Sequence, residues 1–152
     1  MHSKKLILVS GPTAVGKTDY CIDLALKYGS PVISCDSRQI YKEMTIGTAV
    51  PDASQLAAVK HHFIQTHTIH QLFTAGMYEI QALKLMEQLF AEGHDVLVMA
   101  GGSGFYADAV CNGLDDMPPA DDELRASLTA RLKNEGVESL RADLKHLDPE
   151  AY

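Results

Sequence analysis

Residues 11–18 have the types and the spacing of a phosphate-binding loop. Their sequence, GPTAVGKT, matches the pattern G-x-x-x-x-G-K-[ST] at every fixed position. Glycines at both ends allow the backbone to turn around an anion so that its N–H groups point inward, and a lysine adds a mobile positive charge. The hydroxyl of Thr18 can ligate Mg²⁺. The loop therefore predicts a site for a polyphosphate or a diphosphate, without specifying a reaction.

The segments on either side of this loop suit the motif. An apolar run at residues 4–10 precedes it, and apolar residues at helical spacing follow it over residues 16–28. We expect Lys17 to be catalytic and Thr18 to hold the metal, while every residue of the loop binds the diphosphate. The expected diphosphate ligands are Gly11, Pro12, Thr13, Ala14, Val15, Gly16, Lys17 and Thr18.

Two more side chains follow other apolar segments and are candidates for the same site. Asp36 comes directly after PVISC, at residues 31–35, and its carboxylate can serve as a general base, as a metal ligand or as the cap of the turn that follows. Ser103 lies in the Gly-Gly-Ser-Gly loop after DVLVMA and can donate its hydroxyl to a phosphate oxygen, or have no role. Because ligands bind at the carboxyl ends of parallel strands, we expect these residues to face one crevice.

The end of the segment DVLVMA, at residues 95–100, bears on the reaction class. In an ATPase or GTPase motor, an aspartate at the end of a later strand helps to hold the metal. Here that segment continues into Gly101-Gly102, which disfavours a motor. A small-molecule kinase that uses ATP, and a transferase with diphosphate as its leaving group, both remain open.

The apolar pattern predicts an α/β fold. Strands are expected at 4–10, 31–35 and 95–100, all buried, with a brief strand at 62–64. Helices are expected at 16–28, 52–59 and 74–91, and another is expected to start near Gly104. The apolar face expected for the long helix consists of Ile80, Leu83, Leu85, Met86 and Leu89. This alternation indicates a parallel sheet with helices on both faces, a three-layer P-loop NTPase-like arrangement.

The character of the chain changes near Pro118-Pro119. Asp121 can cap a helix, and leucines at helical spacing beyond it mark two acidic amphipathic helices with no strand pattern. We therefore expect a core domain at 1–113 and the start of a helical insert subdomain at 114–152.

Composition and charge limit the class of protein. The 152 residues are 46% hydrophobic and carry a net charge of −7, which argues against a general nucleic-acid coat. The region at 1–48 is the mildly positive one, so an anionic substrate is expected there. The apolar runs are too short for a membrane span or a signal peptide, and the 3 cysteines show no C-x-x-C spacing. We expect a soluble, cytoplasmic protein.

Four stretches together resemble one enzyme family. GPTAVGKT, CDSRQIYKEMTIGTAVP at 35–51, HHF at 61–63 and GGSGFY at 101–106 are similar, in order and spacing, to the tRNA dimethylallyltransferases, also called tRNA isopentenyltransferases. The Asp-Ser-x-Gln-x-Tyr stretch followed by Ile-Gly-Thr-Ala is far more specific than the phosphate loop. Members of this family are about twice as long, so the chain resembles an N-terminal half.

The resemblance implies a reaction, a cofactor and partners. The dimethylallyl group of dimethylallyl diphosphate would pass to N6 of the adenine 3′ to the anticodon of a tRNA, with Mg²⁺ as cofactor. Asp36 would accept the N6 proton, and Ser103 would bond the departing diphosphate. The resemblance further implies that the anticodon loop of the tRNA is a partner. We expect a monomer that does not bind a membrane. The implied tRNA contacts are Asp36, Ser37, Arg38, Gln39, Ser103 and Arg125.

Some residues depart from the family pattern, and rival functions remain. Ser103 stands where threonine is usual, Val50 replaces a common lysine, and Gln65 stands where aspartate is frequent. A small-molecule kinase would need lid arginines, for which Arg125, Arg131 and Arg141 are available. A third hypothesis is an inactive fragment that binds diphosphate without turning it over.

Overall fold

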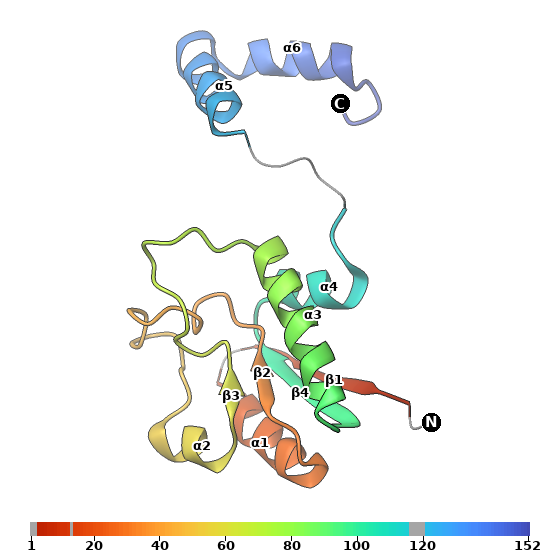
Figure 1. Ribbon diagram of the computed structural model, residues 1–152. Helices are drawn as coiled ribbons and strands as arrows, with labels where there is room; N and C mark the ends of the chain where they lie inside the picture. Colours follow the sequence, from red (N-terminus) through yellow and green to blue (C-terminus); the bar gives the residue numbers. More distant parts are fainter. Residues whose placement is uncertain (1–2, 13, 116–120) are drawn as a thin grey trace. The chain divides into compact units, whose positions relative to one another are not determined.

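The structure is a computed structural model that describes residues 3–12, 14–115 and 121–152. The chain divides into two compact units, Met1–Leu114 and Asp115–Tyr152 (Figure 1). The first unit holds a parallel sheet with helices, and the second holds a pair of helices. Each unit is described by itself.

The sheet of the first unit has four strands, all parallel. In sequence they are β1 (Lys5–Ser10), β2 (Val32–Ser34), β3 (His61–His62) and β4 (Val96–Gly101), and in space their order is β1-β4-β2-β3. The last strand in sequence thus lies between the first two. Its carboxyl end is flanked by theirs, since Gly101 pairs with Ser10 and Ala100 pairs with Ser34.

Helices cover both faces of this sheet, which confirms the predicted three-layer α/β fold. Alternate residues of β4 point to opposite faces. Val98 packs on one face with Cys21 and Ala25 of α1 (Lys17–Tyr28). Leu97 and Met99 pack on the other, in a cluster that includes residues of α3 (Ala75–Ala91) and α4 (Gly104–Asn112). A short helix, α2 (Ala53–Ala58), begins with a capping box formed by Asp52 and Gln55.

The prediction that residues 4–10 form a buried strand is wrong about burial. Within the described sheet β1 pairs with β4 and forms one edge, and Leu8 is 38% exposed. The central residues Leu97, Val98 and Met99 of β4 are 0% exposed. An apolar run predicts a strand, but the strand order decides which strand has neighbours on both sides, and no local pattern contains that order.

The strand predicted at 62–64 is also displaced. The observed strand is His61–His62, and it ends because Phe63 has a φ of +61°, outside the extended region. This turn sends the Phe63 ring into the core, where it packs edge-on against Tyr78 with ring centroids 5.1 Å apart.

The face that the long helix α3 buries agrees only in part with the predicted one: Leu89 is buried and Leu85 and Met86 pack against the core, but Ile80 and Leu83 do not. Ile80 is 70% exposed and Leu83 is 39% exposed, whereas Tyr78 and Ala82 are fully buried. Ala82 has only a methyl group, so the helix can lie close to the sheet there. The Tyr78 ring stacks on Tyr106 at 4.6 Å. Apolar residues occur on several sides of this helix, so their spacing alone did not single out the packed face.

The Tyr78 hydroxyl is placed beside the end of β2. It donates a hydrogen bond of 2.9 Å to the carbonyl oxygen of Ser34, two residues before Asp36. Burial raises the pKa of this hydroxyl, so it stays a donor at neutral pH. Helix α3 thereby fixes the backbone from which Asp36 emerges.

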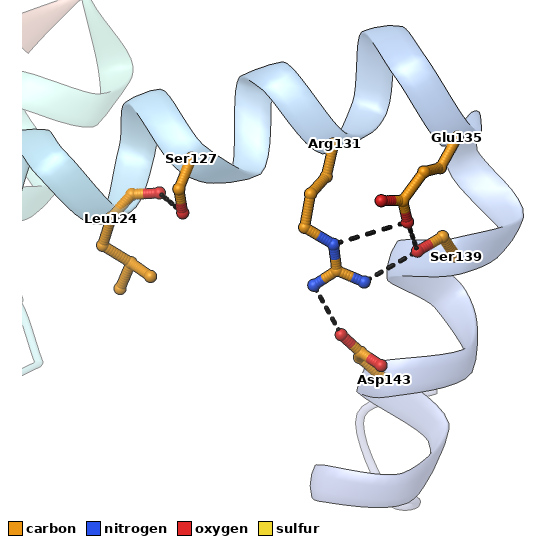
Figure 2. A network of polar contacts seen from close by, with 6 residues as sticks. All are labelled: Leu124, Ser127, Arg131, Glu135, Ser139 and Asp143. Atoms are coloured by element: carbon orange, nitrogen blue, oxygen red, sulfur yellow. Dashed lines mark hydrogen bonds and ion pairs between the residues drawn. The ribbon is translucent and has the colours of Figure 1, made fainter.

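The second unit consists of α5 (Asp122–Glu135) and α6 (Val137–Leu147), the two acidic helices that were expected. Asp121 caps α5 by accepting a hydrogen bond of 2.9 Å from the Leu124 N–H, as predicted. Figure 2 shows how Arg131 joins the helices: its guanidinium lies 2.7 Å from Asp143 and donates to Ser139, while Glu135 lies 3.6 Å away.

Among the described residues, no helix combines the length and the apolar character that crossing a membrane requires.

Candidate functional site

The phosphate loop joins the end of β1 to the start of α1. Gly16 is the N-cap of α1, with φ +84°, a conformation that favours glycine. It contributes no side chain to the cap, so the N–H groups of the first helical turn are free to face an anion. Ala14 also has a positive φ of +67°. Gly16 and Ala14 therefore have left-handed backbone conformations just before α1, as tight turns require.

Lys17 folds back across this loop. Its ammonium group donates a hydrogen bond to the carbonyl oxygen of Pro12, within the loop itself. Lys17 and Thr18 are both half-buried. The expected ligand Thr13 lies outside the described residues.

Two glycines at the end of β4 bring the three strand ends together. A Cβ at Gly101 would lie 2.6 Å from the carbonyl carbon of Cys35 and 2.7 Å from its Sγ, so no side chain fits there. A Cβ at Gly102 would lie 3.7 Å from Oδ2 of Asp36 and 4.0 Å from the carbonyl oxygen of Gly11. Gly102 thus lies between Asp36 and the phosphate loop. Sequence reasoning used these glycines to disfavour a motor and as part of a family motif, although their place after an apolar strand was also a signal of close approach.

Asp36 shows one of the roles that its position suggested, and its roles as a base and as a metal ligand stay predictions. Its Oδ1 accepts hydrogen bonds from the backbone N–H groups of Arg38, at 2.9 Å, and Gln39, at 3.2 Å. The side chain therefore caps the turn that follows β2. Its Oδ2 faces Gly102. One oxygen fixes the orientation of the carboxylate, and the other faces the loop where phosphate is expected.

Ser103 connects the loop after β4 to the loop after β2. Its Oγ accepts a hydrogen bond of 2.9 Å from the Ser37 N–H and donates one of 2.9 Å to the Ser37 Oγ. The two predicted residues are thus in direct contact. Contact of Ser103 with a diphosphate stays a prediction, and it requires the hydroxyl hydrogen to turn away from Ser37.

Gln39 and Arg38 differ in their surroundings. The Gln39 amide nitrogen donates to the carbonyl oxygens of Thr48, at 3.1 Å, and Ala49, at 2.8 Å. Arg38 is exposed, as is Arg125 on α5 of the second unit. The tRNA contacts expected of these residues stay predictions.

A cavity of about 260 Å³ opens at this edge of the first unit. Its lining includes Lys17 and Thr18 of the phosphate loop and Asp36, together with Gly101 and Gly102. Sequence reasoning had not assigned the other walls, which come from the end of β2, the loop before α2, α2 itself, β3 and the residues after it. They include Ser34, Thr48, Ala49, Pro51, Gln55, His61 and Ile64.

The donor atoms of the cavity suit a hard divalent cation. Thr18 contributes a hydroxyl and Asp36 a carboxylate, both oxygen ligands of the kind that Mg²⁺ prefers. Mg²⁺ usually binds to one or two protein groups and completes its shell with phosphate oxygens and water. The residues present therefore fit a magnesium ion that is shared with a diphosphate.

The buried cysteines near the site are unsuited to nucleophilic catalysis. Burial raises the pKa of the Cys21 thiol to about 11 and that of Cys35 to about 12. Both thiols are therefore protonated at neutral pH, and the reactive form of cysteine is the thiolate. Their role is packing on the two faces of the sheet.

Comparison with known proteins gives consistent relatives. The chain is 48% identical over 149 residues to a tRNA dimethylallyltransferase of Flavobacterium johnsoniae, covering 98% of this chain and 48% of that protein. It is 47% identical over 147 residues to tRNA dimethylallyltransferase 2 of Porphyromonas gingivalis, covering 97% of this chain and 49% of that protein. The chain thus spans about half the length of the curated relatives it matches.

Solved structures agree with this result. The crystal structure of the full-length tRNA isopentenylpyrophosphate transferase of Bacillus halodurans matches with a TM-score of 0.71 and 34% identity, over 98% of this chain and 49% of that one. A eukaryotic dimethylallyltransferase acting on tRNA matches with a TM-score of 0.81 over 98% of this chain and 37% of that one. At 24% identity, the second likeness shows the fold alone.

The family model described as IPP transferase matches residues 39–152, a range that begins after the phosphate loop and Asp36. The resemblance inferred from the sequence is therefore confirmed by residues beyond the predicted phosphate-binding loop. The chain belongs to the IPP transferase family.

Proposed function

We propose that this chain forms the diphosphate-binding and base-bearing part of an enzyme that transfers a dimethylallyl group to tRNA. The group would pass from dimethylallyl diphosphate to N6 of the adenine 3′ to the anticodon. The observation that carries this proposal is the single cavity of about 260 Å³ in which the phosphate loop, Asp36 and the Gly101-Gly102 turn meet. Family membership and relatives named for this reaction support it.

The chemistry requires stabilisation of a leaving group and removal of a proton. The N6 atom of adenine attacks C1 of the dimethylallyl group, and the bond between C1 and the diphosphate oxygen breaks with its electron pair on oxygen. An exocyclic amine is a weak nucleophile, so the rate depends on how well the developing negative charge is stabilised. The attacking nitrogen then loses a proton.

Residues of the first unit suit these two tasks. The N–H groups at the start of α1 and the ammonium group of Lys17 would face the diphosphate, once Lys17 exchanges the Pro12 carbonyl for a phosphate oxygen. The Oδ2 of Asp36 would accept the N6 proton, because Oδ1 is already held by two backbone N–H groups. Ser103 would turn its hydroxyl toward the departing diphosphate.

Mg²⁺ would be held by Thr18 together with the oxygens of the diphosphate, and Asp36 lines the same cavity. The chemistry that this ion supplies when bound is partial neutralisation of the leaving group.

The partner is the anticodon loop of a tRNA, from which the target base must leave the stack to reach a pocket. Ser37, Arg38 and Gln39 would lie on the approach to Asp36, and Arg125 would contribute from the second unit. We place the enzyme in the cytoplasm, acting as a monomer.

The comparisons support the transferase over the rival ATP-dependent kinase. Two of the three arginines that a kinase lid could use are paired with carboxylates of the second unit, while Arg125 is exposed. Arg131 pairs with Asp143 and Glu135, and Arg141 pairs with Glu138. These two arginines are engaged within the helical pair, whereas a kinase lid needs arginines that can reach phosphates.

A transfer assay tests the proposal. The chain is joined to the C-terminal half of the Flavobacterium johnsoniae relative and incubated with dimethylallyl diphosphate, Mg²⁺ and unmodified tRNA. We expect N6-dimethylallyl-adenosine in the digested tRNA. Phosphorylation of a metabolite by ATP, without any prenylated tRNA, would instead establish the kinase. Diphosphate binding by the chain without transfer by the joined protein would identify an inactive fragment.

A further inference from the structure

We propose that Gln39 is a positioning residue: its side-chain amide holds residues 44–49 in place as one wall of the cavity. This inference rests on the proposed function for the identity of the ligand, but the contacts that carry it involve this chain alone. They concern the end of β2, the turn after it and the loop that follows.

The hydrogen-bond inventory of Gln39 supports this role. A glutamine amide has two N–H donors, and here the nitrogen lies 3.1 Å from the Thr48 carbonyl oxygen and 2.8 Å from that of Ala49. The oxygen accepts a weaker contact of 3.4 Å from the hydroxyl of Ser34. The reverse orientation of the amide would set its oxygen against two carbonyl oxygens, so the chemistry fixes which atom points where. Both N–H donors of this amide are therefore engaged within the chain.

The loop that Gln39 holds needs such support. Gly47 and Ala49 have positive φ values of +79° and +52°, and only the glycine tolerates this conformation freely. Ile46 is 96% exposed, so apolar packing does not anchor the tip. Within the loop, the Thr48 hydroxyl donates to the Met44 carbonyl oxygen. The bonds from Gln39 are therefore a main attachment of this loop to the end of the sheet.

The Gln39 backbone ties the same residue to the site. Its N–H donates to Oδ1 of Asp36 at 3.2 Å, and its carbonyl oxygen accepts a bond of 2.8 Å from the Gln65 N–H. Gln39, Thr48 and Ala49 all line the cavity that contains Asp36. One residue thus sets the position of the wall relative to the expected base.

Hydrogen–deuterium exchange of the ligand-free chain is the direct test. In Gln39→Ala, amides of residues 44–51 should exchange about tenfold faster, because the carbonyl oxygens of Thr48 and Ala49 lose their donors. Exchange in α3 should stay unchanged. Gln71→Ala, on an exposed glutamine in another loop, is the matched control and should leave residues 44–51 unaffected.

A pH profile separates positioning from general stability. Gln39→Glu has the same shape, but its carboxylate faces two carbonyl oxygens and repels them. Below the pKa of the introduced carboxyl, its O–H can donate to one of them. Protection of residues 44–51 relative to the unsubstituted chain should therefore be low at pH 8 and partly restored at pH 5. A variant that merely folds poorly would lose protection in all elements and would not regain it at low pH.

A binding measurement tests whether the wall formed by residues 44–49 affects the site. It also distinguishes the positioning role of Gln39 from the proposed function. Without RNA, Gln39→Ala should weaken the binding of dimethylallyl diphosphate with Mg²⁺ by about tenfold, since the cavity wall is no longer fixed. Faster exchange in a chain that binds no dimethylallyl diphosphate would leave the positioning role intact and overturn the proposed function. Unchanged exchange in both variants would overturn the positioning role. Unchanged exchange with weaker binding of an anticodon stem-loop RNA would make Gln39 an RNA contact.

Discussion

The contacts that stabilise the first unit internally differ in kind from those that stabilise the second. In the first, the carboxyl ends of β1, β4 and β2 approach so closely that a Cβ at Gly101 has no room, and buried side chains such as Tyr78 fix the backbone around the site. In the second, the described residues of α5 and α6 are joined by the Arg131 network on a surface in contact with water.

This difference indicates how each unit should respond to change. A site built on close approach and on single hydrogen bonds in a low-dielectric environment is sensitive to one atom. Exposed ion pairs lose energy to solvation, side-chain entropy and salt, so that removing one changes little. We therefore expect large effects from substitutions at the sheet edge and small ones in the helical pair.

The largest effect is expected for Asp36→Asn in the joined enzyme. The amide keeps the shape of the side chain and can still accept the N–H bonds of Arg38 and Gln39, but it cannot take up a proton. Turnover should fall by about 10²- to 10⁴-fold, the usual range for a general base. Single-turnover transfer assays measure this loss, and calorimetry should show diphosphate binding within about twofold of the unsubstituted protein. Full activity of the variant would remove Asp36 from the role of base.

The next effect concerns the close approach of β4 to β2. Gly101→Ala places a methyl carbon within 2.7 Å of Cys35, so the strands must separate or shift. The free energy of unfolding should fall by about 1–3 kcal/mol, as in other overpacked cores. Urea denaturation of the chain measures it. Gly104→Ala is the matched control, because a Cβ there meets open space at the start of α4. Equal stability of the two variants would contradict the close approach.

A smaller effect is expected where α3 supports the end of β2. Tyr78→Phe removes the donor to the Ser34 carbonyl oxygen but keeps the ring that stacks on Tyr106. The free energy of unfolding should fall by about 1–2 kcal/mol, the cost of leaving a buried polar group without its partner. Thermal denaturation followed by circular dichroism measures the change, with Tyr20→Phe on the exposed side of α1 as the control. An equal or larger loss for Tyr20→Phe would show that the buried hydrogen bond of Tyr78 does not decide the effect.

Sequence reasoning succeeded where the type of a residue determines the local backbone conformation or the cap of a helix. The left-handed glycine before α1 and the Asp121 cap of α5 depend on local backbone needs, and these needs can be recognised in the sequence. It failed where distant segments compete for the same space. Leu8 and Leu97 lie in equally apolar runs, yet one is 38% exposed and the other 0%, because the strand order places β4 in the centre.

The candidate site shows the same limit. Asp36 could be chosen from the sequence because it follows an apolar strand. The bond between Ser37 and Ser103 spans 66 positions, and that between Gln39 and Ala49 depends on a loop with left-handed residues. Neither has a local pattern. Among the features that reasoning missed, only the Gly101-Gly102 pair had a signal in the sequence, since adjacent glycines after an apolar run indicate close backbone approach.

The smallest effect is expected in the helical pair of the second unit, and it would sharpen the contrast in sensitivity between the two units. Arg131→Ala removes the bonds to Asp143, Ser139 and Glu135, but the Arg131 side chain is about one-third exposed, and the side chains of its carboxylate partners are about half exposed. Amide exchange in α5 and α6 should rise slightly at low salt, and the difference from the unsubstituted chain should vanish at 1 M NaCl, where exposed charges are screened. Arg141→Ala is the control, because its pair with Glu138 lies within α6 and does not join the two helices. A loss of all protection in α5 and α6 that persists in high salt would show that Arg131 supports the helical pair by packing. That result would contradict the contrast between the two units, because the helical pair would then also be sensitive to the loss of one side chain.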